Sequence, residues 1–308
     1  MADEVFLSII NGPELREQVG GSIDDDVWSQ QVAAFNTMIS LVGTLAVTIR
    51  QNCVDALKHM LHVGPLREHY LPLVDPAPGK KRSWFAGVAA WDCIYETDFD
   101  VDAISEWLHS PGRFDTGYRV QRIPQKFIPN LEKLKDDLTA SPESMNNCLN
   151  SLPETMIVTI QDRYGLLLQT NEVGTGISQL VPIVVAAHQS KQDTIIFEQP
   201  ELHLHPKSQL VIADLLITRA NARLKYQQFI IETHSEHIAL RLLRRIRETS
   251  SGDHANSQLS ITPDRIAIIY AHPTATGTSV QELRVDETGE FIDRWPAGFF
   301  DERAEELF

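Results

Sequence analysis

The sequence predicts an α/β protein with a largely parallel β-sheet, a helical lobe and some antiparallel β-structure. Short apolar runs at 194–197 and 229–231 are each followed by a helical segment. Repeated strand–helix alternation is typical of a parallel sheet whose strands are buried on both faces. The β-rich runs 156–160 and 166–168, which a turn at 162–165 joins, add a hairpin.

The first half of the chain is expected to contain the helical lobe. Residues 26–61 are expected to be mostly helical, because apolar residues such as Val32, Phe35 and Ile39 recur at helical spacing. Residues 100–150 are expected to be a mixture of helices and turns.

The second half continues the alternation of strands and helices. A helix is expected to start near Ser178, and Pro206 fits the first turn of the next helix, where its missing N–H does little harm. The strand at 229–231 ends in polar residues before a further helix. The tail returns to β-character at 265–270 and 279–285.

The order of these elements divides the chain of 308 residues into three parts. Residues 1–154 are expected to form the helical lobe with connecting segments. Residues 155–258 form the α/β core, and residues 259–308 a C-terminal extension that contains β-structure.

The net charge of the chain argues against a broad nucleic-acid-binding surface. The formal net charge is −15, which opposes a broad nucleic-acid surface on this chain alone, because binding a phosphate backbone needs clustered Lys and Arg. The segment 241–247 is a local basic exception, and we expect it to be the solvated face of a helix.

The cellular compartment is predicted to be the cytoplasm. The three cysteines Cys53, Cys93 and Cys148 form no C-x-x-C pair, as expected for reduced thiols. The start of the chain is acidic and lacks the pattern of a secretory signal. We find no run of about 18 uncharged apolar residues, and therefore expect no membrane span and no membrane partner.

The strongest chemical signal is the segment 195–206, IIFEQPELHLHP. Its apolar run ends in Glu198, and ligands of open α/β sheets bind at the carboxyl ends of the strands. A carboxylate there can hold Mg²⁺ together with water and nucleotide phosphates. An acid at the tip of a buried strand is common, but Glu201, His203 and His205 make a chance pattern much less plausible.

A second segment, FIIETHSEH at 229–237, repeats the pattern of an apolar strand that ends in polar residues. His234 lies where a side chain can reach a γ-phosphate or orient an attacking water. A lone histidine at such a place is more often an ordinary hydrogen-bonding residue. Its position one strand–helix unit after the acidic strand favours the functional interpretation.

A third segment, NEVGTGISQLVP at 171–182, is rich in glycine. Gly174 and Gly176 let the backbone approach an anion, and Ser178 with Gln179 opens a helix. The free N–H groups and the positive dipole end of a helix suit a phosphate. A single motif of this kind is weak, so its weight comes from its place before the other two.

Taken in this order, the three segments resemble those of ABC-type ATPases, which have the P-loop NTPase fold. The branch includes SMC-like and overcoming-lysogenization-defect-like proteins and is also called AAA15-type. Within it, the chain is similar to bacterial ATPases that end in a small C-terminal domain of unknown function. VGPLRE at 63–68 and DRWPAGFFDE at 293–302 add to the resemblance, which runs from about residue 60 to the end.

The resemblance implies a role for each matching residue. The signature motif, which caps the γ-phosphate of a nucleotide held by the opposite subunit, is matched by Gly174, Gly176, Ser178 and Gln179. Glu198 matches the Walker B acid that organises Mg²⁺, and Gln199 stands at the position of the catalytic glutamate. Glu201 follows it, His205 lies where the D-loop begins, and His234 matches the switch histidine.

The chain departs from this pattern in lacking a phosphate loop. The motif G-x-x-x-x-G-K-[ST] does not occur, because Val74 and Lys81 occupy required positions around the only Gly-Lys pair, Gly79–Lys80. Without that loop no backbone cradle or lysine grips the β- and γ-phosphates. The chain therefore looks truncated, or works as a half-protein beside another.

The second departure is Gln199. An amide cannot abstract a proton, but it can position water by hydrogen bonding, as Gln does in some GTPases. Glu201 or His234 would then supply the base. An engineered Glu→Gln exchange is the alternative explanation, and we favour a natural residue.

The leading hypothesis is an ATP-binding and ATP-hydrolysing subunit that dimerises around Mg²⁺ and ATP to drive a partner. The dimer would be a homodimer or a pair with another ATPase subunit. The resemblance implies a nuclease or nucleic-acid partner, in DNA maintenance or phage defence.

Two alternatives remain open at this point. The chain is a degenerate regulatory or scaffold subunit that completes the ATP site of a partner, or it is a metal-dependent hydrolase. In the second case Glu201, His203, His205, His234 and His237 would form a zinc site. A zinc site requires these side chains to converge.

Overall fold

The protein was described from a computed structural model, which places residues 25–68, 82–96, 98–126, 142–189, 192–222, 227–253 and 257–294. The chain forms two compact units, Met1–His59 and Met60–Phe308. The residues around Gly79–Lys80 and the aromatic segment after Arg294 lie outside the described residues.

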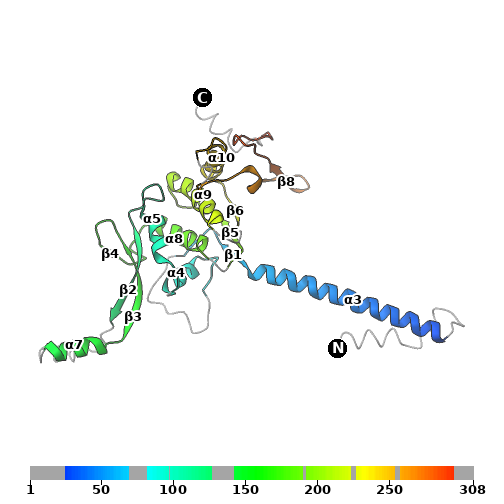
Figure 1. Cartoon of the computed structure of the whole chain (residues 1–308), viewed down its shortest axis with the longest axis horizontal. Helices are drawn as coiled ribbons and strands as arrows, with labels where there is room; N and C mark the ends of the chain where they lie inside the picture. The colour runs from blue at the N-terminus through cyan, green and yellow to red at the C-terminus, as the bar shows by residue number, and fades with distance from the viewer. Residues whose placement is uncertain are drawn as a thin grey trace. The chain divides into compact units, whose positions relative to one another are not determined.

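The first unit contains one long helix, α3 (Asp25–Lys58) (Figure 1). The predicted helix at 26–61 is thus confirmed, apart from its last residues. Thr37, Thr44 and Thr48 each donate a hydroxyl hydrogen bond of 2.8 Å to the carbonyl four residues earlier. The large apolar side chains exposed on this helix include Phe35, Met38, Leu41, Val42, Leu45, Val47 and Ile49.

The expectation that no segment is long and apolar enough to span a membrane is wrong. Trp28–Lys58 passes that test by length and composition, with a mean hydropathy of 1.8 over its best window, none of it buried. The expectation failed because Ser, Thr and Asn lie between the apolar residues of this uncharged stretch. The stretch was therefore not recognised as a continuous apolar run. A helix that packs against protein passes the same test.

The second unit is organised around a parallel sheet of three strands in the order β1-β5-β6. These are β1 (Met60–Val63), β5 (Thr194–Glu198) and β6 (Gln228–Glu232). Both predicted buried strands are confirmed. β1 was missed, because four residues directly after a long helical pattern carry too little signal of their own, and its pairing partner is more than 100 residues away.

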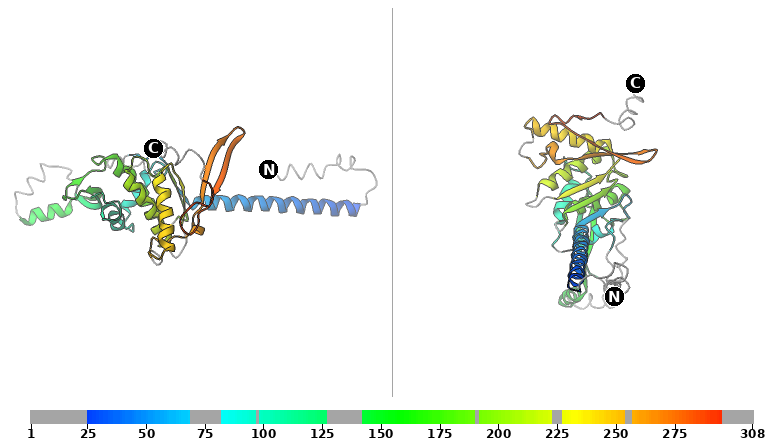
Figure 2. Two further views of the ribbon diagram at one scale, coloured as in Figure 1. Left: turned by 90° about the horizontal axis from the view of Figure 1, so that it is seen from above. Right: turned by 90° about the vertical axis from the view of Figure 1, so that its right-hand side faces the viewer.

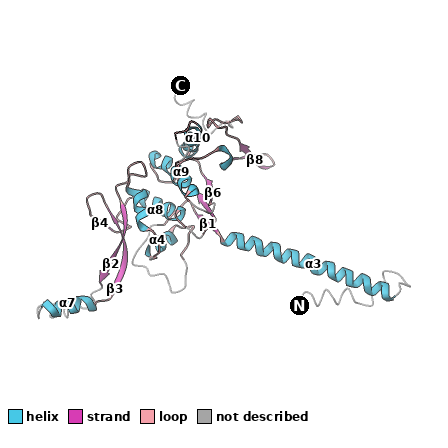
Figure 3. Cartoon of the chain, in the orientation of Figure 1, coloured by secondary structure: helices cyan, strands magenta, loops and turns pink. Residues whose placement is uncertain are grey.

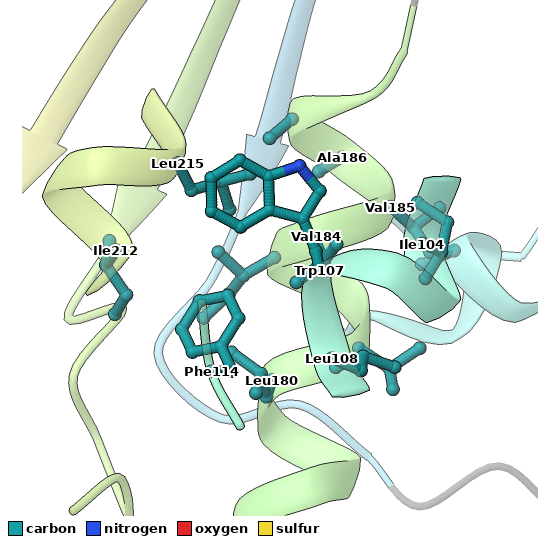
Figure 4. Close-up of a cluster of buried hydrophobic side chains, with 14 of the residues drawn as sticks. Ile104, Trp107, Leu108, Phe114, Leu180, Val184, Val185, Ala186, Ile212 and Leu215 are labelled. Carbon is teal, nitrogen blue, oxygen red and sulfur yellow. The ribbon is translucent and has the colours of Figure 1, made fainter. Parts of the chain in front are cut away.

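Helices α4 (Val88–Tyr95), α5 (Val101–His109), α8 (Thr175–Ala187), α9 (Pro206–Asn221) and α10 (Glu236–Ser250) belong to this unit. Every residue of α8 from Ser178 to its end is buried. Figure 4 shows Trp107, Phe114 and Leu180 gathered in one cluster with side chains of α5, α8 and α9. Pro206 opens α9 as predicted.

A second, antiparallel sheet joins β2 (Arg119–Lys126), β3 (Glu154–Gln161) and β4 (Leu167–Leu168). β3 and β4 are the predicted hairpin, and Asp162 closes its turn by accepting hydrogen bonds from the backbone N–H groups of Tyr164 and Leu166. The region 100–150 was expected to be a mixture of helices and turns, and β2 was therefore missed. Between β2 and β3 lies α7 (Pro142–Ser151) (Figure 3).

The C-terminal segment forms a hairpin of β7 (Ile268–Thr274) and β8 (Gly277–Leu283), drawn in orange in Figure 2. The predicted β-character of the tail is confirmed. Together, the parallel sheet, its helices and the antiparallel sheets confirm the predicted α/β class. β1 falls within the segment 1–154 that the sequence assigned to the helical lobe, and the three-part division stays a prediction.

The basic segment 241–247 on α10 is only in part the solvated face that its composition suggested, because Arg244 and Arg247 are exposed whereas Arg241 and Arg245 are largely buried. Arg245 is only 7% exposed, and it shares the buried carboxylate of Asp214 on α9 with Arg241. The remaining two arginines pair with Glu248 and Glu290. Arg241 and Arg245 therefore join α10 to α9, whereas the pair of Arg244 with Glu248 lies within α10.

Candidate functional site

The carboxyl ends of β5 and β6 lie side by side, and they carry most of the residues singled out from the sequence. Glu198 ends β5 directly opposite Glu232, the last residue of β6. The strands reach this point because Ile195 and Phe197 are fully buried and anchor β5 in the core. The half-exposed carboxylate of Glu198 therefore stands at the ligand-binding edge of the sheet.

Gln199 continues from β5 in a left-handed conformation, with φ of 42°. Its backbone N–H donates to the carbonyl oxygen of Glu232 at 2.9 Å and lies 3.2 Å from the Glu232 carboxylate. These bonds extend the β5–β6 pairing by one residue. The partly buried Gln199 side chain is thus held at the strand edge, where an amide can orient a water molecule.

Glu201 ties the loop after β5 to the loop after β6. Its carboxylate accepts hydrogen bonds of 2.8 Å from the hydroxyl of Thr233 and from the backbone N–H of His234. Both Glu201 oxygens are used in this contact, which favours a role in holding the loop over a role as a base. The His234 ring remains 74% exposed, with Nε2 3.5 Å from the Glu232 carboxylate.

Among the described residues, the Glu198 carboxylate makes one side-chain contact, with His62 on β1. The Nε2 atom of His62 lies 2.8 Å from Oε1 of Glu198, and both side chains are partly exposed. The second carboxylate oxygen, Oε2, has no hydrogen-bond partner among the described residues. This suits Mg²⁺, which is commonly held by one or two carboxylates with phosphates and water as its other ligands.

The glycine-rich segment forms the amino end of α8. Gly174 is the residue that precedes the helix, and no side chain caps it. Gly176 packs against the loop after β5, since a Cβ there would lie 3.4 Å from the carbonyl oxygen of His203. The first exposed hydroxyl of the helix belongs to Thr175, whereas Ser178 is 1% exposed.

The buried side chain of Gln179 faces the protein rather than solvent. Its Oε1 accepts hydrogen bonds from the backbone N–H and from Nε of Arg67, at 3.2 and 3.0 Å. Arg67 is 3% exposed, and burial lowers its pKa to about 10. The VGPLRE segment therefore supports α8 from within the chain, and Ser178 and Gln179 are almost fully buried, with 1% and 5% exposure.

His205 caps the amino end of α9, where its Nδ1 accepts the backbone N–H of Lys207 at 3.2 Å. The proposed zinc ligands do not converge: among residues that the structure describes, no group of three or more His, Cys, Asp or Glu side chains can hold a metal. The geometry thus removes the support for the zinc hydrolase.

Residues 102–239 match the family described as AAA ATPase domain, AAA_15. The central part of this chain therefore resembles an AAA ATPase domain. The C-terminal residues 261–308 match a second family, described as protein of unknown function, DUF3696. The predicted AAA15-type ATPase with a C-terminal domain of unknown function is confirmed, and no curated protein sequence matches the chain.

Among solved structures, the chain is similar to Smc head domains. A head domain with a coiled coil and joint derived from Pyrococcus yayanosii has 12% identity and a TM-score of 0.35, over 59% of this chain and 26% of that chain. A SmcHead bound to the C-winged helix domain of ScpA has 12% identity and a TM-score of 0.37, over 64% and 44%. The chain thus spans less than half of either.

A third solved structure comes from work on the ATP-driven dimerization and DNA stimulated activation of SMC ATPases. It has 11% identity to the chain and a TM-score of 0.34. The alignment covers 70% of this chain and 92% of that chain.

Three residues of the candidate site were not predicted as site residues. His62 belongs to the unpredicted strand β1, so nothing in the sequence connected it with Glu198. Thr175 was passed over between two glycines, although a hydroxyl at the first position of a helix is a recognisable signal. Glu232 was visible as an acid at the end of a strand, in the same position as Glu198.

Proposed function

We propose that the ATPase domain binds Mg²⁺ and ATP at the carboxyl edge of β5 and β6 and hydrolyses ATP as one half of a paired site. The observation that carries this proposal is the contact of Glu201 with Thr233 and His234. It holds together two loops that follow different strands, so that Glu198, Gln199 and His234 share one edge of the sheet. Such convergence is typical of nucleotide sites in α/β proteins.

Each side chain has a defined task in this proposal. Glu198 would hold Mg²⁺, which when bound neutralises charge on the phosphates. Gln199 would orient the attacking water by hydrogen bonding, since its amide is no base. His234, exposed and beside Glu232, is the group best placed to take part in proton transfer or to contact the γ-phosphate.

In this proposal the phosphate loop comes from outside residues 1–308, and a second nucleotide-binding unit is one source of it. The sheet leaves room for such a unit beside the site, because Ile230 in the middle of the edge strand β6 is 43% exposed. Among the described residues, β6 pairs only with β5. An open edge beside the site is where another strand can add.

The exposed start of α8, with Gly174 and Thr175, supports a contact across a subunit interface, in a homodimer or with another ATPase subunit. The proposal includes that pairing and a nuclease or nucleic-acid partner. It also includes action in DNA maintenance or phage defence, and a cytoplasmic location. The second candidate function is a scaffold subunit without hydrolysis of its own, which Gln199 and the missing phosphate loop favour.

The test is ATP hydrolysis by the chain purified together with the subunits it binds in its native cells. Glu198→Ala is expected to lower the turnover by about 10²- to 10³-fold, in the range seen when one electrostatic contact is removed from a transition state. Glu282→Ala, at an exposed carboxylate on β8, is the matched control and should leave turnover unchanged.

Hydrolysis that is equally fast in wild type and in Glu198→Ala would refute the proposal and favour the scaffold. Calorimetry with Mg²⁺ and ATP on the chain alone adds a second measurement. Binding that Glu198→Ala abolishes would show that the chain holds a complete nucleotide site and needs no paired unit.

A further inference from the structure

His62 on β1 contacts the Glu198 carboxylate although it belongs to none of the sequence motifs. In the β1–β5 register, His62 is opposite Ile196. Side chains two residues apart on a strand point to the same face of a sheet, so His62 and Glu198 share a face. Their contact, 2.8 Å from Nε2 to Oε1, runs diagonally between neighbouring strands.

The ring of His62 is held in place by Phe85. The two rings pack edge to face, with centroids 5.1 Å apart and an interplanar angle of 79°. Gly64 makes room for this packing, because a Cβ at that position would lie 2.8 Å from atoms of the Phe85 ring. The Gly64 N–H also donates to the carbonyl oxygen of Phe85 at 2.9 Å. The imidazole is therefore oriented by its packing against Phe85, which the Gly64 backbone holds in place.

We propose that His62 is a positioning residue that orients Glu198 for a divalent metal ion. The Nε2–H group donates to Oε1 and fixes the carboxylate, and Oε2 is left for the metal or for its bound water. Hydrogen-bond partners of metal-ligating groups commonly set the orientation and affinity of those ligands. This inference rests on the metal-binding role given to Glu198 in the proposed function.

Stabilisation of the fold does not account for the contact. The side chains of His62 and Glu198 are 41% and 36% exposed, and a pair so open to solvent contributes little to folding. Leu61 and Val63, which flank His62 and point to the other face, are buried and secure β1 without it. His62 can therefore be changed with little effect on the sheet.

The test measures binding of Mn²⁺, in place of Mg²⁺, to the full chain by electron paramagnetic resonance of the free ion. His62→Gln carries an amide N–H near the place of Nε2, whereas His62→Asn has the same chemistry on a shorter side chain that does not reach Oε1. We expect His62→Asn to weaken Mn²⁺ binding by about 10- to 100-fold and His62→Gln to restore most of it.

Glu198→Ala should abolish this binding, and His272→Ala, at a histidine stacked on Tyr270 in the β7–β8 hairpin, is the control. Melting curves of all variants should stay close to that of the wild type. Equal Mn²⁺ affinity in His62→Asn, His62→Gln and the wild type would overturn the inference, as would equal losses in both His62 variants. Binding that survives in Glu198→Ala, or no binding by the wild type, would instead refute the metal-binding role of Glu198.

Discussion

His188 closes α8, and its ionisation connects the stability of the protein to pH. Its Nδ1 donates to the carbonyl oxygen of Val184 at 2.7 Å. Burial, with a further contribution from the positive charge of Arg219, lowers the pKa of His188 from 6.5 to about 4. The folded chain thus keeps this imidazole neutral at a pH where the unfolded chain protonates it.

The sign of the pH dependence follows from this difference. The stabilisation is fully present above pH 6.5 and is lost as the pH falls toward 4, because the unfolded state then binds the extra proton. His188→Asn keeps a donor for Val184 and does not titrate. Between pH 7 and pH 4.5, the wild type should lose about 1–3 kcal/mol more unfolding free energy than this variant, as measured by urea denaturation.

His59→Asn, at an exposed position on the other unit, is the control and should follow the wild type. If His188→Asn shows the same pH profile as the wild type, His188 is not protected from protonation in the folded protein.

At the scale of elements, one carboxylate joins α9 to α10. Asp214 on α9 has a side chain that is 5% exposed, and it accepts hydrogen bonds from both Arg241 and Arg245. The side chain of Arg245 is 9% exposed, and its hydrogen bonds to Asp214 raise its pKa. A buried charge of this kind depends on its partner, because water cannot replace it.

Asp214→Ala is expected to lower the unfolding free energy by about 3–5 kcal/mol, since it leaves buried arginine charge without its main acceptor. Arg244→Ala removes a comparable pair with Glu248, but from a side chain that is 62% exposed, and should cost less than about 1 kcal/mol. Chemical denaturation of both variants gives the comparison. Equal losses would mean that Asp214 is compensated by water or by other groups.

At the scale of the whole molecule, α8 is the centre of the second unit. Leu180 is 1% exposed and lies in the cluster with Trp107 and Phe114 (Figure 4). The same helix starts with the glycine-rich segment of the candidate site. Packing in the core and placement of the site are therefore properties of one helix.

Leu180→Ala should lower the unfolding free energy by about 2–5 kcal/mol, because the lost apolar contact leaves a cavity in the cluster. Leu240→Ala removes the same side chain from α10, where it is 40% exposed, and should cost roughly 1 kcal/mol or less. Denaturation followed by tryptophan fluorescence reports on the cluster through Trp107. A loss for Leu180→Ala no larger than for the control would show that the core relaxes around the change.

The parts that could be predicted from the sequence are those with a strong local pattern. The strands that end at Glu198 and Glu232, and the helix that Pro206 opens, carry apolar runs or first-turn signals that act within a few residues. The helix start near Ser178 was three residues late, since Gly174 precedes the helix without a capping side chain. β1 and β2 were missed because their pairing partners are distant in sequence.

The sequence by itself determined the family, the α/β class and the residues at the ends of β5 and β6, because these depend on short motifs and local periodicity. Only the tertiary structure decided which of those residues meet. It brought His62 to Glu198, directed Gln179 inward to Arg67 and separated the proposed zinc ligands. These outcomes depend on strand order and helix packing, which join residues far apart in the chain and leave no local pattern.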